Sequence, residues 1–546
     1  MSARLDPREL LASLATQKVA ANIWWRRPSI FLPAMTPPAV HEAIKQRLGW
    51  LEAPDAAARQ IPELDVFASG VRRDGFTDIY LLGMGGSSLA AEVLRDATPR
   101  TPRGAQLTVL DTTDEKTIRD VTTRLAPERS LFIVASKSGS TIEVNALERH
   151  FWETLAVRRG RGTGAHFVAI TDPETALGAM AAERQYRHVF LNAPDIGGRY
   201  SALSLFGLVP AAILGHDIRA LTVSGQRMMT SCRPDTTANP GLALGAFLSA
   251  EASSGRDKLT LLTSPSLVSF ASWIEQLVAE SSGKDGKGML PIVGEPIGAP
   301  DEYGSDRSFV ALVSPGDTEI DGHIQALEAS GRRVLRLEMP VSDIGGEFFR
   351  WEFGTAVLGT SLRVNPFDEP NVREAKVRTA AHLEQRSPSG SFRISPPFER
   401  REGFLARVSR AVKSRDLGPR YLAILDYLPA DPGRAAVIAE VRANHRRTTQ
   451  EASTHGIGPR YLHSTGQFHK GGPNTGMFLM LSATDPHKTS VPGETYSFSG
   501  LKQAQALGDF EALVAAGRDV LHCHFESIPA DLGGALTSLI AVLEGR

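Results

Sequence analysis

The chain has 546 residues, which is too long for a single hydrophobic core, so we expect two to four domains. The 60 basic residues are balanced by 61 acidic ones, which excludes an overall basic surface for nucleic acid. Its two cysteines exclude a disulfide framework and a cysteine-rich zinc site. Because we find neither a secretory-signal pattern at the N-terminus nor a run of 18 apolar residues, we expect a cytoplasmic protein without a membrane segment.

The first half of the chain alternates between strand and helix patterns. Residues 1–60 have helical periodicity and are expected to form an N-terminal cap on a first domain, at 61–230. Short apolar runs within that domain predict strands at 78–83, 107–112, 130–136, 166–171 and 188–192, with helices between them. This alternation favours a parallel, doubly wound sheet, which binds ligands at the carboxyl ends of its strands.

A second unit of the same kind is expected at 231–376. Strand patterns lie at 258–264, 309–314 and 333–339, and helical patterns at 266–281, 321–330 and 347–362. Residues 377–419 are rich in Arg, Ser and Pro and are interpreted as a linker or loop. The remainder mixes strands and helices, so residues 377–546 are assigned to an α/β C-terminal extension.

A glycine-rich turn follows the first predicted strand. Gly83 and Gly85 fit the dinucleotide fingerprint G-x-G-x-x-G, but Ser88 stands at its third glycine position. Asp111 is not a convincing ribose-binding acid at the next strand end. The turn lets the backbone approach a ligand closely, yet it is a weak signal for a dinucleotide.

The segment "ASKSGST" comes between the third predicted strand and its helix. It supplies four hydroxyl groups, the Lys137 cation and a helix N-terminus, which together suit a phosphate. The alternative is a cluster that only caps the helix. Four hydroxyls, a lysine and a glycine exceed what a cap needs, so we expect an anion site.

Two further positions bear charges that catalysis can use. Arg199 follows two glycines after a strand, where it can reach a developing negative charge or lie solvated on a loop. Glu280 shares a helix face with Trp273 and Leu277, whereas Glu275 is expected on the solvent face. Glu280 is thus a candidate general base, the alternative being a solvated residue at a frayed helix end.

Two segments of the last unit each carry a pair of histidines that could be functional. His463 and His469 lie in the Gly-rich segment "RYLHSTGQFHKGGPNTG", which is either a catalytic loop or a structural one. His522 and His524 lie on the same side of a predicted strand, two residues apart. Without a clear third ligand they are a weak metal signal, and a half-buried strand is favoured.

Five motifs of the chain resemble those of the phosphoglucose isomerase family and occur in the same order. They are "GMGGSS", "SKSGST", "GGRYS", the "ESSGK" helix end and "NPFDEP" followed by Lys376. The resemblance implies two doubly wound, flavodoxin-like sugar isomerase (SIS) domains and a homodimer. The chain looks most similar to the isomerase half of bacterial bifunctional transaldolase/phosphoglucose isomerase proteins, which makes a transaldolase a possible partner.

The resemblance also implies which residues bind the substrate, a small sugar phosphate. By motif, Gly86 and Ser87 contact the sugar, and Gln276 contacts it one helical turn before the base. The 6-phosphate is held by Ser136, Lys137, Ser138 and Thr141.

The catalytic roles follow from the same motifs. Glu280 matches the base that moves a proton between C2 and C1, Arg199 the residue that stabilises the enediolate, and Lys376 the lysine involved in ring opening. We therefore expect interconversion of glucose 6-phosphate and fructose 6-phosphate through a cis-enediol, as in glycolysis and gluconeogenesis, with no cofactor and no metal.

Two positions depart from the family's pattern. The family has a catalytic histidine after a G-E-P turn, where this chain has none; His323, His463 and His469 are the candidates, and we favour the last two. Glu369 stands where the family commonly has glutamine. These departures keep three alternatives open: an SIS-type isomerase of another phosphorylated or sulfonated sugar, a non-catalytic sugar-phosphate sensor, and, least favoured, a dinucleotide-dependent dehydrogenase.

Overall fold

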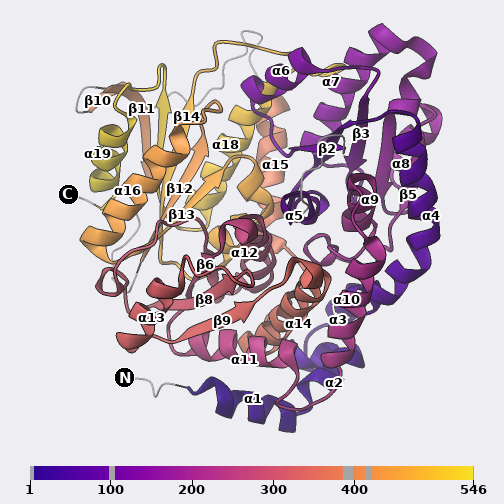
Figure 1. Cartoon of the computed structure of the whole chain (residues 1–546). Helices are drawn as coiled ribbons and strands as arrows, with labels where there is room; N and C mark the ends of the chain where they lie inside the picture. Colours follow the sequence, from indigo (N-terminus) through magenta and orange to yellow (C-terminus); the bar gives the residue numbers. More distant parts are fainter. Residues whose placement is uncertain (1–4, 98–104, 385–397, 402–403, 412–419, 545–546) are drawn as a thin grey trace.

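The computed structural model describes residues 5–97, 105–384, 398–401, 404–411 and 420–544. Three α/β units lie beside one another, with the N-terminal helices along the bottom and the right side of the view (Figure 1). None of the helices in these ranges is both long enough and apolar enough to cross a membrane.

The first unit contains a five-stranded, fully parallel sheet of order β2-β1-β3-β4-β5. Its strands are β1 (Asp78–Gly83), β2 (Gln106–Leu110), β3 (Ser130–Ala135), β4 (Phe167–Thr171) and β5 (His188–Leu191). The intervening helices are α5 (Leu89–Ala97), α6 (Glu115–Arg124), α7 (Ile142–Arg159) and α8 (Ala176–Glu183). All residues of β3 and β4 are buried, which is why these strands read as continuous apolar runs. The predicted doubly wound fold is confirmed for this unit, with the flavodoxin-like strand order.

The second unit has a smaller parallel sheet of order β7-β6-β8-β9. Its strands are β6 (Lys258–Thr263), β7 (Leu290–Ile292), β8 (Arg307–Val313) and β9 (Val334–Glu338). Its helices are α11 (Pro240–Ser253), α12 (Val268–Ser282), α13 (Asp321–Ala329) and α14 (Ile344–Leu362). The three-residue β7 was not predicted, because so short a run has no readable periodicity.

The N-terminal helices pack on both units rather than on the first alone. They comprise α1 (Pro7–Thr16), α2 (Val19–Trp24), α3 (Pro38–Lys45) and α4 (Ala53–Arg73). Helix α1 packs against α11 of the second unit, whereas α4 packs against α9 (Leu205–Leu214) and α10 (Ile218–Ser231), which follow the first sheet. One hydrophobic core therefore extends from these helices through both units.

The third unit is built on a six-stranded sheet of order β10-β11-β15-β14-β12-β13. Strands β12 (Tyr421–Tyr427), β13 (Ala452–Ile457), β14 (Gly476–Ala483) and β15 (Asp519–Phe525) are parallel, and β10 (Phe398–Arg401) and β11 (Phe404–Ala411) add an antiparallel edge. The unit's helices are α16 (Arg434–Thr449), α17 (Gly466–Gly471), α18 (Phe498–Ala515) and α19 (Leu532–Glu544).

The linker expected at 377–419 is therefore wrong in part. Helix α15 (Pro370–Glu384) runs through its beginning and packs against α18, and β10 and β11 occupy part of the rest. Residues 385–397, 402–403 and 412–419 lie outside the described ranges. Polar composition suggested a loop, but pairing with β15 makes β11 a strand.

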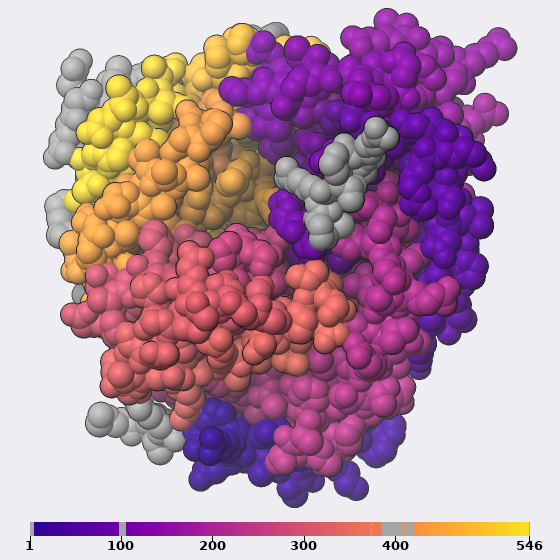
Figure 2. Space-filling view, in the orientation of Figure 1, coloured from indigo at the N-terminus to yellow at the C-terminus, as the bar shows by residue number. Residues whose placement is uncertain are grey.

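The third unit contacts both other units, as Figure 2 shows for its orange and yellow surface. Toward the second unit, the buried Arg446 guanidinium lies 2.9 Å from the Glu302 carboxylate. Toward the first, the buried Lys502 ammonium lies 2.8 Å from Asp114. Because buried ion pairs hold only in well-defined geometry, these contacts fix the third unit against its neighbours.

Candidate active site

Strand register brings the two predicted ligand turns together. Gly83 at the end of β1 is opposite Ala135 at the end of β3, so the turns that follow them are neighbours at the carboxyl edge of the sheet. The strand order reverses between β1 and β3, which is where ligands bind in this architecture. The site is therefore placed by topology before any side chain is considered.

The glycine turn is closely packed against the segment that carries Arg199. Gly85 has a φ of +54°, which favours glycine. A Cβ atom on Gly86 would lie 1.9 Å from the carbonyl oxygen of Gly198 and 2.8 Å from the backbone nitrogen of Arg199. Glycine at position 86 thus allows the two backbones to touch, and Arg199 takes its place from that contact.

Replacing Gly86 with alanine should lower kcat/KM by about a hundredfold, because the backbone that positions Arg199 must move aside. Gly197→Ala is the matched control, since a Cβ there meets nothing within 4 Å. Steady-state kinetics with circular dichroism as a folding check would measure both. Equal activity of the two variants would contradict the tight contact.

The serine-rich turn forms one wall of the cavity. The hydroxyl oxygens of Ser138 and Ser140 lie 3.0 Å apart, and Ser136 Oγ lies 3.0 Å from Thr141 Oγ1. Thr141 is the N-cap of α7, but its side chain makes no capping hydrogen bond. Ser138 and Thr141 line the cavity, whereas Ser136 is buried behind Thr141 and supports it.

Lys137 is held by partners that sequence reasoning missed. Its ammonium group forms an ion pair with Asp172 and donates a hydrogen bond of 2.9 Å to the Pro194 carbonyl oxygen. Burial lowers the pKa of Lys137 from its usual range, and the Asp172 carboxylate opposes this shift. Asp172 follows β4, so its approach to Lys137 depends on the pairing of β3 with β4.

The carboxylate of Glu280 is buried at the end of α12, with 7% of the residue exposed. It accepts a hydrogen bond of 3.2 Å from Gln276 Nε2, one turn earlier, and lies 3.5 Å from Arg199 Nη1. Burial raises the pKa of Glu280, and the nearby Glu369 carboxylate raises it further, whereas Arg199 opposes the shift. The predicted helix face is therefore correct for Glu280.

Glu275, in contrast, was expected on the solvent face of α12 and is half-buried instead. Burial raises its pKa to about 7, while Arg460 and Arg442 of the third unit oppose the shift. The periodicity was right, but the third unit covers the face that would otherwise be solvent.

Arg199 is buried, and most of its donors have fixed acceptors. Nε donates to Ser281 Oγ at 2.8 Å, and Nη2 donates to the carbonyl oxygens of Pro366 and Asp368 at 2.9 and 2.8 Å. Nη1 lies 3.2 Å from Glu369 Oε2 as well as near Glu280. The guanidinium is thus held rigidly with Nη1 directed at two carboxylates, which excludes the solvated arginine considered above.

The two favoured histidines have different positions. His463 lines the cavity, and its Nε2 lies 3.0 Å from Glu143 Oε1, which also accepts a hydrogen bond of 2.7 Å from Gln505. His469 is buried in α17, where its Nδ1 lies 3.0 Å from the Tyr421 hydroxyl oxygen. Burial lowers the pKa of His469 well below its usual range.

Of the histidine candidates, the structure therefore brings only His463 to the cavity. His323 belongs to α13 and lines a different hollow, near Arg446. Sequence reasoning missed Glu143, because a glutamate in the first turn of a helix is an ordinary dipole-favouring choice. Gln505 lies 362 positions from Glu143, and no local signal connects them.

These groups enclose a cavity of about 400 Å³, within the range of small-ligand sites. It is lined by residues of all three units. The predicted residues on its wall are Gly86, Ser87, Lys137, Ser138, Thr141, Arg199, Gln276, Glu280, Lys376 and His463. Ser136 and His469 are the predicted residues that do not line it.

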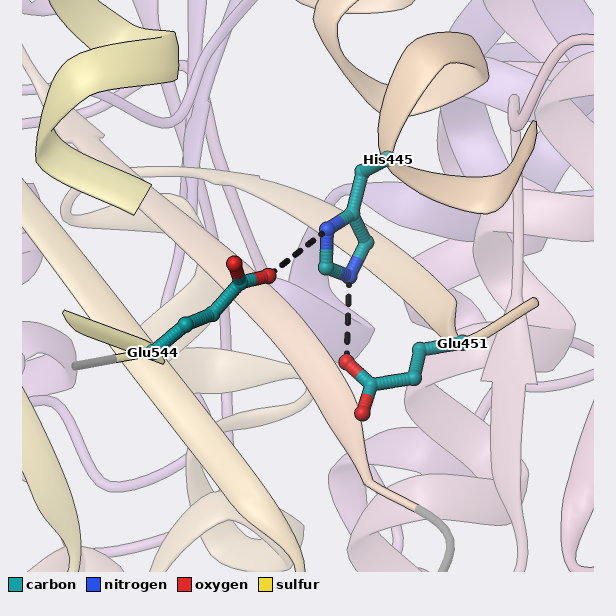
Figure 3. Close-up of side chains that lie close together, drawn as sticks. All are labelled: His445, Glu451 and Glu544. Atoms are coloured by element: carbon teal, nitrogen blue, oxygen red, sulfur yellow. Dashed lines mark ion pairs between the residues drawn. The ribbon is translucent and has the colours of Figure 1, made fainter. Parts of the chain in front are cut away.

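The third unit contains a cluster of side chains of the kinds that ligate metals. Within the described ranges, one set of His, Cys, Asp and Glu side chains is close enough to share an ion: His445, Glu451 and Glu544. Figure 3 shows the carboxylates facing different ring nitrogens, with Glu451 3.3 Å from Nε2 and Glu544 3.4 Å from Nδ1. A metal ion would bind one nitrogen of the ring, with both carboxylates directed at that same position. Because the carboxylates face different nitrogens, the arrangement suits a histidine that bridges two carboxylates. His522 and His524 both lie within hydrogen-bond distance of Ser482 Oγ.

Two doubly wound parallel sheets with a serine-rich turn at the shared cavity define the SIS type of α/β protein. The fold agrees with solved structures. A hypothetical protein of Thermus thermophilus is 24% identical, with a TM-score of 0.59 over 69% of this chain and 96% of that one. A glucose-6-phosphate isomerase of Chlamydia trachomatis is 18% identical, with a TM-score of 0.51 over 70% of this chain and 85% of that one.

Sequence comparison narrows the class to a family. The family model for phosphoglucose isomerase matches residues 67–289. A glucose-6-phosphate isomerase of Rubrobacter xylanophilus is 30% identical over 397 residues, covering 63% of this chain and 91% of the relative. The chain belongs to the phosphoglucose isomerase family.

Proposed function

We propose that the protein interconverts glucose 6-phosphate and fructose 6-phosphate through a cis-enediol. The observation that carries the proposal is the pairing, in one cavity, of a buried Glu280 carboxylate with a rigid Arg199 guanidinium 3.5 Å away. Family membership and the names of the relatives support this substrate. The serine-rich turn, whose Ser138 and Thr141 line the same cavity, offers hydroxyl donors for the 6-phosphate.

The reaction begins with ring opening. A proton must reach the ring oxygen O5 while one leaves the O1 hydroxyl, which requires an acid and a base near these atoms. His463 and Lys376, both on the cavity wall, are assigned to this step. Glu143 accepts the hydrogen bond at His463 Nε2 and holds the ring in one orientation.

Isomerisation then moves one proton between two carbons and one between two oxygens. Glu280 removes the proton from C2 of the open aldose, and the electron pair forms the C1–C2 double bond while the C1 carbonyl oxygen gains negative charge. O1 gains a proton as the O2 hydroxyl loses one, and the protonated Glu280 returns its proton to C1 as the C2 carbonyl forms, which yields the ketose. Arg199 Nη1 is assigned to the oxygen that gains negative charge. Because Nε and Nη2 are held by other acceptors, the guanidinium does not have to reorient as the charge develops.

A second candidate is an SIS-type isomerase of another anionic sugar. It is favoured by the position of Glu369, whose carboxylate lies 3.2 Å from Arg199 Nη1. The two remaining alternatives are a sensor, which would bind sugar phosphates without turnover, and a dehydrogenase, which would bind NAD(P) in a thermal-shift assay. A homodimer, a cytoplasmic location and a transaldolase partner are further parts of the proposal.

The deciding experiment is an assay of the purified chain with glucose 6-phosphate, fructose 6-phosphate and a panel of phosphorylated and sulfonated sugars. We expect turnover of the first two. Turnover of another sugar only would favour the second candidate, and binding without turnover would favour the sensor.

A further inference from the structure

Residues 460–471 of the third unit close one side of the cavity. They form a short 3-10 turn, Arg460–His463, followed by α17. The backbone carbonyl oxygen of His463 accepts a hydrogen bond of 2.7 Å from Gln276 Nε2, whose side chain also contacts Glu280. The segment therefore touches the general base's own hydrogen-bond partner.

Arg460 anchors the start of this segment to the first unit. Its guanidinium forms an ion pair with Glu92 of α5, and Nη1 lies 3.1 Å from Asp111 Oδ2 after β2. Asp111, the acid considered above for a ribose, is thus used to hold the third unit. Two carboxylates with little exposure beside one arginine make this anchor directional.

Gln467 anchors the middle of the segment to the second unit and to α15. Its Nε2 donates to the Gly283 carbonyl oxygen at 2.9 Å and to Asn371 Oδ1 at 2.8 Å. Its Oε1 accepts a hydrogen bond of 2.9 Å from the backbone N–H of Asn371. Since Gln467 is fully buried, these bonds have no competition from water.

The segment also remains attached to its own unit. The Tyr461 hydroxyl donates to Asp509 Oδ2 of α18 at 2.6 Å, and Lys470 pairs with the other oxygen of Asp509. Helix α15, which carries Lys376 on the cavity wall, packs directly on α18. The first two units, α15 and the third unit therefore converge on the cavity within one chain.

We propose that the third unit is a part of the active site in its own chain: residues 460–471 supply His463 to the cavity that the same chain's Glu280 and Arg199 occupy. Each chain then holds a complete site and needs no side chain from a second copy. This inference rests on the proposed isomerase function only for the role of His463, and not for its position.

The position can be tested without activity. A chain carrying Glu92→Cys and Arg460→Cys is treated with a short bis-maleimide and run on a denaturing gel. We expect an intrachain bridge, seen as a monomer band with the mass of one added crosslinker. A covalent dimer would overturn the proposal. The wild-type chain is the control, because Cys232 and Cys523 are buried and should not react.

The role can be tested by mixing inactive chains. Glu280→Gln and His463→Asn chains with different tags are co-expressed, and complexes that carry both tags are isolated alongside the unsorted mixture. We expect no more activity than either variant has alone. If chains exchanged His463, one site in each mixed dimer would be intact, and the mixture would regain about a quarter of wild-type activity. An active wild-type monomer would also support the proposal.

The two tests distinguish the ways of being wrong. A wild-type chain without turnover of any sugar would end the proposed function. The crosslink would still show whether residues 460–471 at the cavity come from the same chain or from a second copy. Restored activity together with a covalent dimer would end the present inference and leave the isomerase proposal intact.

Discussion

Replacing Glu280 with glutamine is expected to lower kcat by about a thousandfold, because an amide cannot accept the C2 proton. Substrate affinity should change little, since the amide keeps the shape of the carboxylate beside Gln276 and Arg199. Steady-state kinetics gives kcat, and calorimetry with a substrate-like inhibitor gives the affinity.

The matched control is Glu275→Gln, the same substitution on the same helix, away from the cavity wall. It should keep activity near that of the wild type. If both variants lost activity equally, the effect would come from α12 as a whole and Glu280 would lose its assigned role.

The pH dependence of the wild type provides an independent test of Glu280. A general base works only when deprotonated, and burial with the neighbouring Glu369 raises its pKa. Activity should therefore fall on the acid side at a higher pH than for an ordinary glutamate. A kcat/KM profile that stays flat down to the usual glutamate range would contradict this assignment.

Replacing Arg199 with glutamine should lower kcat/KM by about 10² to 10³, the usual cost of removing one donor from an oxyanion site. The change removes the charge near the enediolate and leaves the Pro366 and Asp368 carbonyl oxygens without their donor. Thermal denaturation should be measured beside the kinetics, because lost hydrogen bonds also lower the free energy of unfolding.

Glu369→Gln tests how the Glu369 carboxylate affects the site while Arg199 itself is unchanged. It removes a carboxylate 3.2 Å from Arg199 Nη1 and leaves the guanidinium in place. We expect activity with glucose 6-phosphate to be kept or raised, and the acid limb of the profile to move to lower pH. A large loss of activity would instead show that the Glu369 carboxylate itself contacts the substrate, which would favour the second candidate sugar class.

Much of the fold could be predicted because the central strands of both parallel sheets are buried on both faces. Strands such as 130–135 read as unbroken apolar runs, and their spacing by helices identifies the doubly wound class. Helical periodicity also placed Glu280 on the face shared with Trp273. The 377–419 segment was misread in part, because the polar residues of its two strands, 398–401 and 404–411, look the same as a loop.

The individual partners of the site could not be predicted. Lys137 has the sequence context of a free phosphate-binding cation, yet it is paired with Asp172 from the next strand. His463 and His469 are six positions apart in one Gly-rich segment, and only the fold of 460–471 turns the first to the cavity and the second to Tyr421.

The sequence by itself determined the local pieces: the glycine turn, the serine-rich turn and the helix face of Glu280. Each depends on residues that are neighbours in the sequence, and their steric and hydrogen-bonding preferences can be inferred from the residue types alone. Only the tertiary structure decided that the third unit supplies His463 and covers Glu275. Those contacts join residues hundreds of positions apart, as with His463 and Glu143, and depend on strand register and packing, which no local pattern encodes.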